Sequence, residues 1–254
     1  MKDIQNQKDT RNIFINKVGV KDLKYPVVLE DRENGKQHTV ANVNMFVELP
    51  RHYRGTHMSR FVEILNNYHR ETIIDNLENL LLEMKRKLDA KVAYIEFEFP
   101  YFITKKAPVS KKISQMSYQC KFDGSYGDEF IMEMVVKVPV QTLCPCSKEI
   151  SDFGAHNQRS YVTISAVYSE FIWLEELIEV AERSGSAELY SLLKREDEKY
   201  VTEKAYQNPK FVEDVVRNIS SELKGNPRII SYKVEADSME SIHNHNAYAM
   251  VKSD

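Results

Sequence analysis

The chain has 254 residues, of which 42% are hydrophobic and 29% charged, and its formal net charge at pH 7 is −3. These values are typical of a folded globular protein with one large domain or two of about 125 residues, and no apolar run approaches the ~20 residues of a membrane span. The negative charge gives no general attraction for nucleic acid, so neither nucleic acid nor membrane is expected as a partner. Three cysteines and a polar N-terminus without a signal-peptide core favour thiols or metal ligands in a cytoplasmic protein.

The first half of the chain alternates between strand and helix patterns after a polar segment at residues 1–17, to which we assign no role. The Asn34-Gly35 pair is typical of a hairpin turn between the first two strands. Apolar residues from Ile73 to Leu88 form one helical stripe that needs a sheet to cover. The expected elements are strands at 25–29 and 38–49, helices beginning at 56–59 and spanning 73–88, and strands at 93–99 and 116–122.

The second half repeats this order of elements after a turn at residues 123–128. Asn208-Pro209 is expected to cap the last helix, which should stop at Gly225. The expected elements are strands at 130–138 and 162–168, helices at 174–181, 189–193 and 211–219, and strands at 230–236 and 247–251. We therefore predict two tandem modules, at residues 18–124 and 125–254, with most metal ligands in the second.

Residues 141–160 form a long connection between two predicted strands and contain Cys144, Cys146 and His156. Thiolate and imidazole are ligands for zinc and other first-row metals, and Pro145 stiffens the backbone that would hold one sulfur in place. A structural zinc site is disfavoured because Cys120 stands alone in a strand and supplies no second cysteine pair. The alternative is that both loop cysteines are small packed residues and His156 is an ordinary loop histidine.

Other candidate ligands are scattered through the second half. His243 and His245 have the H-x-H spacing that places two side chains on the same side of an extended segment, although a polar turn with two exposed histidines would look the same. The acidic stretch at residues 194–203 has the composition of a solvated surface. Glu213 would ordinarily be explained by pairing with Lys210 and Arg217 on one helix.

Four ordered motifs in this chain closely resemble GTP cyclohydrolase IB, over nearly the whole chain from about Tyr25. The resemblance implies an α+β tunnelling fold with two tandem ββααββ modules, antiparallel sheets and helices on one face. It also implies a homotetramer with active sites at subunit interfaces, which converts GTP and water to 7,8-dihydroneopterin triphosphate and formate in the first step of folate and pterin biosynthesis. The motifs are Arg54-Gly55-Thr56-His57-Met58-Ser59-Arg60-Phe61, Leu143-Cys144-Pro145-Cys146-Ser147-Lys148-Glu149-Ile150, Gly154-Ala155-His156-Asn157-Gln158-Arg159 and His243-Asn244-His245.

Roles for individual residues follow from the same resemblance. One divalent ion per site, zinc, manganese or iron(II), would be bound by Cys144, Glu198 and His243, with His156 in or next to its coordination sphere. The catalytic residues implied are Cys144, His156, His245 and Glu240. The substrate-binding residues implied are Glu213 at the guanine edge and Arg60, Lys148 and Arg159 at the triphosphate, with Lys106, Lys111 and Arg51 as further candidates.

The implied chemistry needs a metal that makes water nucleophilic near neutral pH for attack on C8 of guanine, and a histidine that protonates the ring nitrogen as the ring opens. Two other functions remain open from the sequence. One is a tunnelling-fold enzyme on a purine or pterin in which Cys144 or Cys146 attacks as a thiolate. The other is a noncatalytic interaction module that zinc stabilises.

Overall fold

The computed structural model describes residues 7–68 and 71–253, so residues 1–6 of the predicted N-terminal segment lie outside the described part. The chain divides into two compact units. Unit 1 comprises Met1–Pro100 and Lys121–Glu133, and unit 2 comprises Tyr101–Cys120 and Met134–Asp254. Three long strands contribute residues to both units: β3 (Ala93–Lys106), β4 (Ile113–Tyr126) and β5 (Phe130–Leu143).

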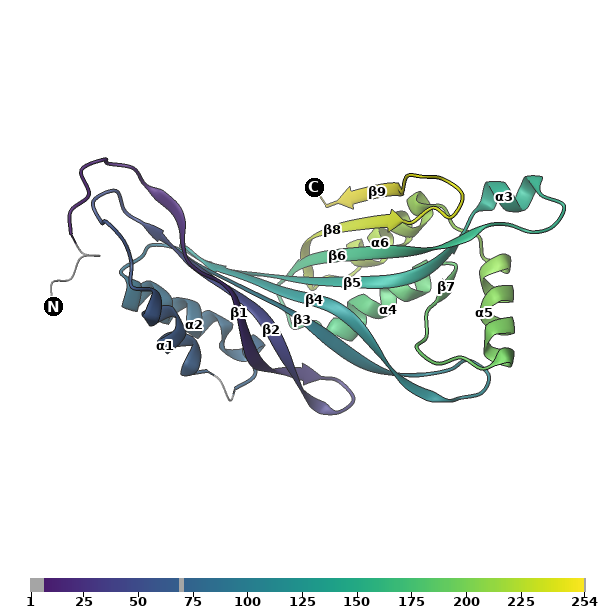
Figure 1. Ribbon diagram of the computed structural model, residues 1–254, viewed down its shortest axis with the longest axis horizontal. Coiled ribbons are helices and arrows are strands. Elements are labelled where there is room, and N and C mark those ends of the chain that lie inside the picture. The colour runs from purple at the N-terminus through teal and green to yellow at the C-terminus, as the bar shows by residue number, and fades with distance from the viewer. Residues whose placement is uncertain (1–6, 69–70, 254) are drawn as a thin grey trace. The chain divides into compact units, whose positions relative to one another are not determined.

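In unit 1, one face of an antiparallel sheet is covered by two helices, as Figure 1 shows. The predicted apolar stripe of the second helix is buried against alternate strand residues such as Met45, Ile95 and Phe97, which confirms the expected pairing of helix and sheet. Each such side chain contributes about 1.5–3 kcal/mol when fully buried. The elements are β1 (Ile15–Asp31), β2 (Gly35–Leu49), α1 (Met58–Asn66) and α2 (Ile73–Leu88), together with the adjoining parts of β3 and β4.

The predicted Asn-Gly hairpin turn joins β1 to β2. Gly35 has φ +79°, a left-handed conformation that glycine adopts without strain. The Asp31 carboxylate accepts hydrogen bonds from the backbone N–H of Glu33 at 2.9 Å and of Asn34 at 2.7 Å. Burial alone would raise the pKa of Asp31, but the hydrogen bonds that its charged form accepts lower it below the ordinary value.

The N-terminal segment lies against the loop that leads into the first motif. The N–H of Asp9 donates to the carbonyl of His52 at 3.1 Å, and the N–H of Arg54 donates to the carbonyl of Gln7 at 3.1 Å. The Arg54 guanidinium also donates to the Gln7 side chain at 2.8 Å. Because β1 begins at Ile15, regular structure starts ten residues before the strand that alternation alone predicts.

Unit 2 has the same arrangement, with helices α4 and α6 on one face of an antiparallel sheet (Figure 1). Its strands follow the hydrogen-bonded order β5-β6-β8-β9, and β7 pairs with β5. None of the helices in the described ranges is long and apolar enough to cross a bilayer. The elements are α3 (Pro145–Ile150), β6 (Asn157–Tyr168), α4 (Leu174–Ser184), β7 (Ala187–Glu188), α5 (Arg195–Gln207), α6 (Val212–Lys224), β8 (Ile229–Ser238) and β9 (Ala247–Lys252).

The predicted helix at residues 189–193 is wrong. That segment is irregular and follows the short strand β7, because the N–H of Ser186 donates to the carbonyl of Gln141 at 2.8 Å and draws the chain onto β5. Helix α5 instead occupies the acidic stretch, and its first turn is fixed by the Asp197 carboxylate, which accepts from the N–H of Lys194 at 2.8 Å.

The predicted cap at Asn208-Pro209 is also wrong for the last helix. Asn208 ends α5, whereas the N-cap of α6 is Phe211, whose N–H donates to the Asp214 carboxylate at 3.0 Å. The carboxylate three residues into α4 does the same for its N-cap, since Glu176 accepts from the N–H of Trp173 at 3.1 Å. In α4, α5 and α6 alike, an acidic side chain three residues after the N-cap therefore accepts the backbone N–H of the N-cap residue.

Candidate functional site

The loop between β5 and β6 is closed at its base by a backbone hydrogen bond. The N–H of Cys144 donates to the carbonyl of His156 at 3.2 Å, so the two predicted ligands flank the loop as neighbours. Cys144 is also the N-cap of α3, and its sulfur accepts from the N–H of Ser147 at 3.4 Å. Pro145 follows at the first helical position, where its missing N–H costs nothing. Cys144 is half-buried, whereas Cys146 is exposed, and both are free thiols.

His156 has polar groups on one side of its ring. Its Nδ1 lies 2.9 Å from the Gln158 side-chain oxygen, 3.4 Å from the Ser241 hydroxyl and 4.0 Å from a Glu240 carboxylate oxygen. Its backbone N–H donates to the Ser147 hydroxyl at 3.3 Å. The side chains of His156 and Glu240 are only 12% and 13% exposed, so the structure brings two of the predicted catalytic residues together in a sheltered position.

The predicted H-x-H pair lies in the loop between β8 and β9. His243 and His245 are exposed, and their rings are stacked with centroids 5.0 Å apart and planes 18° apart. Their side chains therefore lie on the same side, as the spacing predicts. The start of this loop is held beside β6, because the N–H of Met239 donates to the carbonyl of Arg159 at 3.0 Å. The Arg159 side chain itself is exposed.

Helix α5 presents Glu198 to solvent in its first turn, next to a residue that is fully buried. That residue, Asp197, accepts from the N–H groups of Val109 and Ser110, both at 2.8 Å, and from the Ser110 hydroxyl at 2.6 Å. Burial alone would raise the pKa of Asp197, but these hydrogen bonds and that from Lys194 lower it well below the ordinary value. The predicted metal ligand Glu198 therefore lies at an end of α5 that is hydrogen-bonded to the connection between β3 and β4.

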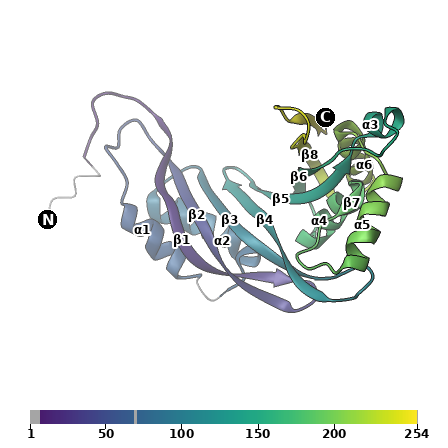
Figure 2. The ribbon, with the colours of Figure 1, turned by 45° about the vertical axis from the view of Figure 1, so that its right-hand side comes forward.

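The predicted substrate-binding residues of unit 2 occupy separate elements. The Lys148 ammonium donates to the Tyr206 carbonyl at 2.7 Å and lies 4.5 Å from the Tyr206 ring centroid, which ties α3 to the end of α5. Figures 1 and 2 show these two helices at the same end of unit 2. Glu213 is exposed in the first turn of α6, where Arg217 lies 4.0 Å from Asp214.

Other basic residues proposed for the triphosphate lie elsewhere in the chain. Arg60 and Arg51 belong to unit 1 and are exposed, and the Arg60 guanidinium donates to the Lys87 carbonyl at 3.1 Å. In unit 2, Lys106 is exposed and Lys111 donates to the carbonyl of Pro108 at 2.7 Å.

The structure brings Cys144 and His156 to one place but does not complete a metal site around them. Among the residues described, no three or more His, Cys, Asp or Glu side chains are grouped so that they could hold a metal ion. Glu198 and His243 therefore form no such group with Cys144 and His156 in the single chain.

Sequence reasoning missed the polar residues behind His156, namely Gln158, Thr142, Ser160 and Ser238. All of them are buried, and they continue the core-facing rows of β5, β6 and β8 in place of apolar residues. The available signal was a hydroxyl or amide at a position where the alternation of the strand requires a buried side chain. Such a residue needs an internal hydrogen-bond partner and so points to a specific arrangement.

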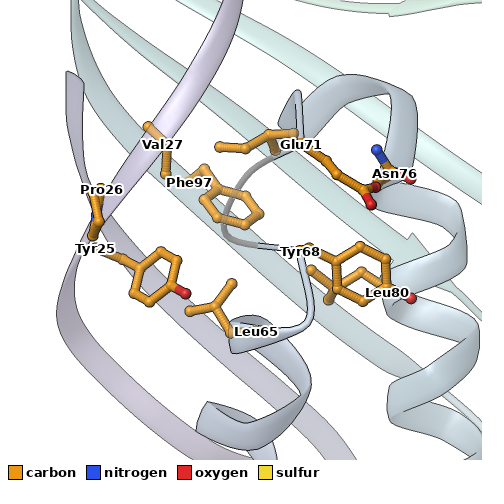
Figure 3. A pocket seen from close by; sticks show the side chains of 10 residues that line it. Tyr25, Pro26, Val27, Leu65, Tyr68, Glu71, Asn76, Leu80 and Phe97 are labelled. Atoms are coloured by element: carbon orange, nitrogen blue, oxygen red, sulfur yellow. The ribbon is translucent and has the colours of Figure 1, made fainter. Parts of the chain in front are cut away.

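A pocket in unit 1 contains none of the predicted site residues. It lies between strands and helices α1 and α2, and Figure 3 shows the rings of Tyr25, Tyr68 and Phe97 around it. The Tyr25 hydroxyl donates to the Asn66 side chain at 2.9 Å. The residues that line it are Tyr25, Pro26, Val27, Leu65, Tyr68, Glu71, Ile73, Asn76, Leu80 and Phe97.

Comparison with known proteins gives matches along almost the whole chain. A family model described as type I GTP cyclohydrolase folE2 matches residues 1–249. The protein named GTP cyclohydrolase FolE2 from Geotalea uraniireducens is 56% identical over 254 residues, which cover 100% of this chain and 94% of the relative. The protein of that name from Thermosipho africanus is 55% identical over 255 residues, which cover 100% and 98%.

Solved structures with the same fold are much more distant in sequence. A uricase from Bacillus fastidious superposes with a TM-score of 0.55 at 8% identity and covers 96% of this chain and 93% of its own. Urate oxidase from Bacillus subtilis 168 gives a TM-score of 0.51 at 9% identity, with coverage of 93% and 97%. At this identity the similarity concerns the fold alone, and it agrees with the predicted α+β tunnelling fold.

Proposed function

The chain belongs to the type I GTP cyclohydrolase FolE2 family, and we propose that it converts GTP and water to 7,8-dihydroneopterin triphosphate and formate at a site built on the loop at residues 144–156. Its relatives of about 55% identity over the full chain are named GTP cyclohydrolase FolE2, which supports a GTP cyclohydrolase that acts in folate biosynthesis. The observation that carries the location of the site is the closed base of this loop, where Cys144 and His156 are hydrogen-bonded neighbours.

We propose that a divalent metal, zinc, manganese or iron(II), is bound by Cys144, His156, His243 and Glu198. Sulfur, imidazole and carboxylate donors suit these ions, and the half-buried Cys144 sulfur is held in place by the backbone N–H of Ser147 at 3.4 Å. When bound, such an ion supplies a water nucleophile at neutral pH. Because these ligands do not converge in the single chain as described, the complete set requires a rearrangement of the exposed loop at 239–246 or a residue from a second copy.

Proton transfer falls to His156, His245 and Glu240 in this proposal. Glu240 lies 4.0 Å from the His156 ring and its side chain is largely sheltered from water, which suits a carboxylate that exchanges a proton through a histidine. His245 is exposed beside His243, so it can reach a substrate that enters from solvent.

Substrate recognition would use one carboxylate and several basic groups. Glu213 is exposed on the first turn of α6, where its two oxygens can accept from the N–H donors of guanine. Lys148 lies in α3 within the loop at 144–156, and Arg159 lies in β6 just after the loop. Both are proposed for the triphosphate, since a polyanion needs several cationic donors in an acidic chain. Arg60 of unit 1 is proposed as a further donor.

We propose that the enzyme is a homotetramer with its active sites at subunit interfaces. Large apolar side chains next to the proposed site support this: Phe153 is 100% exposed, Ile150 is 84% exposed and Ile242 is 65% exposed. Apolar groups gathered around a polar site are typical of an interaction surface. Sedimentation of Phe153→Ala should reveal weaker assembly than that of the wild type, and an unchanged tetramer would exclude this loop from the interface.

We retain the predicted modules, residues 18–124 and 125–254, as a proposal about the internal repeat. Its support is the element order: two strands, two helices and two strands in the first half, and the same order in the second half with α3, β7 and α5 inserted.

Incubation with GTP and each candidate metal, followed by oxidation and measurement of pterin fluorescence, tests the proposed reaction. Product and formate in equal amounts are expected. The matched pair Cys144→Ala and Cys146→Ala tests the metal: loss of bound metal and turnover is expected only for the first variant, since Cys146 is exposed at the loop surface. Full metal content with no turnover in Cys144→Ala would favour a cysteine nucleophile, and absence of product with every metal would overturn the proposed reaction.

A further inference from the structure

Three hydroxyl groups meet inside unit 2 behind the loop at 144–156. They come from the hydrogen-bonded neighbours β5, β6 and β8, and they are Thr142, Ser160 and Ser238, which are 0%, 0% and 1% exposed. The Thr142 and Ser160 oxygens are 2.7 Å apart, those of Ser160 and Ser238 are 2.8 Å apart, and those of Thr142 and Ser238 are 3.3 Å apart. We call these three residues the hydroxyl triangle.

A fourth polar side chain connects the triangle to the surface. The Gln158 amide nitrogen lies 3.1 Å from the Thr142 hydroxyl, and its amide oxygen lies 2.9 Å from His156 Nδ1. Gln158 is itself only 9% exposed. A continuous row of hydrogen bonds therefore runs from the core of unit 2 to the proposed catalytic histidine.

The number of hydroxyl hydrogens determines how this row is oriented. Each hydroxyl has one hydrogen to donate and two lone pairs to accept with. A closed triangle uses all three hydrogens within itself, whichever way round they point, so Thr142 has none left for Gln158 and can only accept from it. The amide nitrogen of Gln158 must then face Thr142, and its oxygen must face His156.

This orientation sets the tautomer of His156. An amide oxygen can only accept, so Nδ1 of His156 must carry the hydrogen, and the neutral ring then keeps its lone pair on Nε2. The other groups near Nδ1, the Ser241 hydroxyl at 3.4 Å and the Glu240 carboxylate at 4.0 Å, also can accept a hydrogen from it. The backbone of His156 is held as well, through Cys144 and Ser147.

We propose that Gln158 and the hydroxyl triangle are positioning residues that hold His156 as the Nδ1–H tautomer and present Nε2 for metal binding or proton transfer. The use of Nε2 rests on the proposed function, whereas the tautomer follows from the hydrogen bonds alone. Partners that orient a histidine from behind in this way typically change metal affinity or activity by about 10–100-fold when they are removed.

A long-range ¹H–¹⁵N spectrum of the metal-free full chain, at a pH where imidazoles are neutral, tests the tautomer directly. The His156 signal is identified by its loss in His156→Gln. The wild type is expected to carry the hydrogen on Nδ1. In Thr142→Val, which removes one hydroxyl at nearly constant volume, Gln158 loses its acceptor, and we expect a mixture of both tautomers together with a fall in kcat of roughly tenfold and little change in KM for GTP.

Thr142→Ser restores the hydroxyl and should recover both the tautomer and kcat. Ser165→Ala is the matched control, because it removes another buried hydroxyl of β6 that is outside the triangle. If Thr142→Val does not fold, Gln158→Leu removes the hydrogen-bond partner of His156 Nδ1 directly and should also give a mixture of both tautomers.

A wild-type spectrum with the hydrogen on Nε2, or an unchanged tautomer in both Thr142→Val and Gln158→Leu, would overturn this proposal. Its failure is separable from failure of the proposed reaction, because the spectrum is recorded without GTP. A correct tautomer in a chain that produces no pterin would leave the positioning intact and refute the reaction only.

Discussion

Both units pack helices on one face of an antiparallel sheet, but the buried side chains between helices and sheet differ. In unit 1, the middle of the helix-covered face of the sheet is apolar, with residues such as Met45, Ile95 and Phe99 that are not exposed at all, and the buried carboxylate of Asp31 lies at the hairpin turn. In unit 2, the equivalent rows of β5, β6 and β8 end in Thr142, Ser160 and Ser238, which are just as buried. Apolar side chains stabilise wherever they are packed, whereas buried hydroxyls require matched partners. The comparison indicates that unit 1 provides stability, while the end of unit 2 provides orientation for the site.

The largest effect expected on activity is that of His156→Ala. This substitution removes the histidine that Gln158 connects to the hydroxyl triangle, and we expect kcat to fall by roughly 10²–10⁴-fold with a small change in melting temperature. His38→Ala, at an exposed position of β2, is the control and should keep full activity. Pterin formation from GTP measures the activity of both variants. Near-normal turnover of His156→Ala would show that the buried polar groups of unit 2 do not serve catalysis by orienting this ring.

A large effect on stability is expected in unit 1. Phe99 is fully buried, with its ring centroid 5.1 Å from that of Phe122, so Phe99→Ala should lower the free energy of unfolding by about 3–5 kcal/mol. Val40→Ala, at a position that is 55% exposed, should change it by less than about 0.5 kcal/mol. Denaturant titration gives both values. If the two variants lowered the free energy of unfolding equally, the buried apolar side chains of unit 1 would not be its main source of stability.

Asp197 should give unit 2 a stability that depends on pH. Because its pKa is lower in the folded chain than in the unfolded chain, its contribution is complete above the unfolded value of about 3.9 and is lost as the pH falls through the folded value. Asp197→Asn should therefore lower the melting temperature by several degrees at pH 7, and the difference from wild type should shrink in strong acid. The exposed neighbour substitution Glu196→Gln should show neither effect. A difference that grows in acid would mean that the sign of the shift is wrong.

The smallest effects are expected within the hydroxyl triangle. Ser160→Ala leaves two buried hydroxyls with one partner fewer each, and should cost about 1–3 kcal/mol of unfolding free energy. The double variant Ser160→Ala/Ser238→Ala should cost less than the sum of its single variants, because the second substitution removes a group that has already lost its partner. Strict additivity, measured by denaturant titration, would show that the three hydroxyls do not act as one network.

Regular amphipathic patterns were sufficient where the burial of one face determines the element. The stripe of α2, the alternation of β3 and the Asn34-Gly35 turn were all predicted, because side-chain period and turn chemistry are local properties. Residues 189–193 were wrongly predicted as a helix, since the chain just before them, at residues 187–188, pairs with β5, a strand nearly 50 residues earlier. The acidic stretch was not predicted as a helix because Asp197 finds its main partners at residues 109 and 110.

Local patterns in the sequence were sufficient for most of the helices and strands, for the soft ligands of the 144–156 loop and, through the motifs, for the enzyme family. Which polar groups lie behind His156 could be seen only in the folded chain, because Thr142, Ser160 and Ser238 are far apart along the sequence and meet through strand pairing. A hydroxyl in a strand has the same local pattern whether it faces water or another hydroxyl. Its partner, and therefore its role, is set by the neighbouring strands and their register.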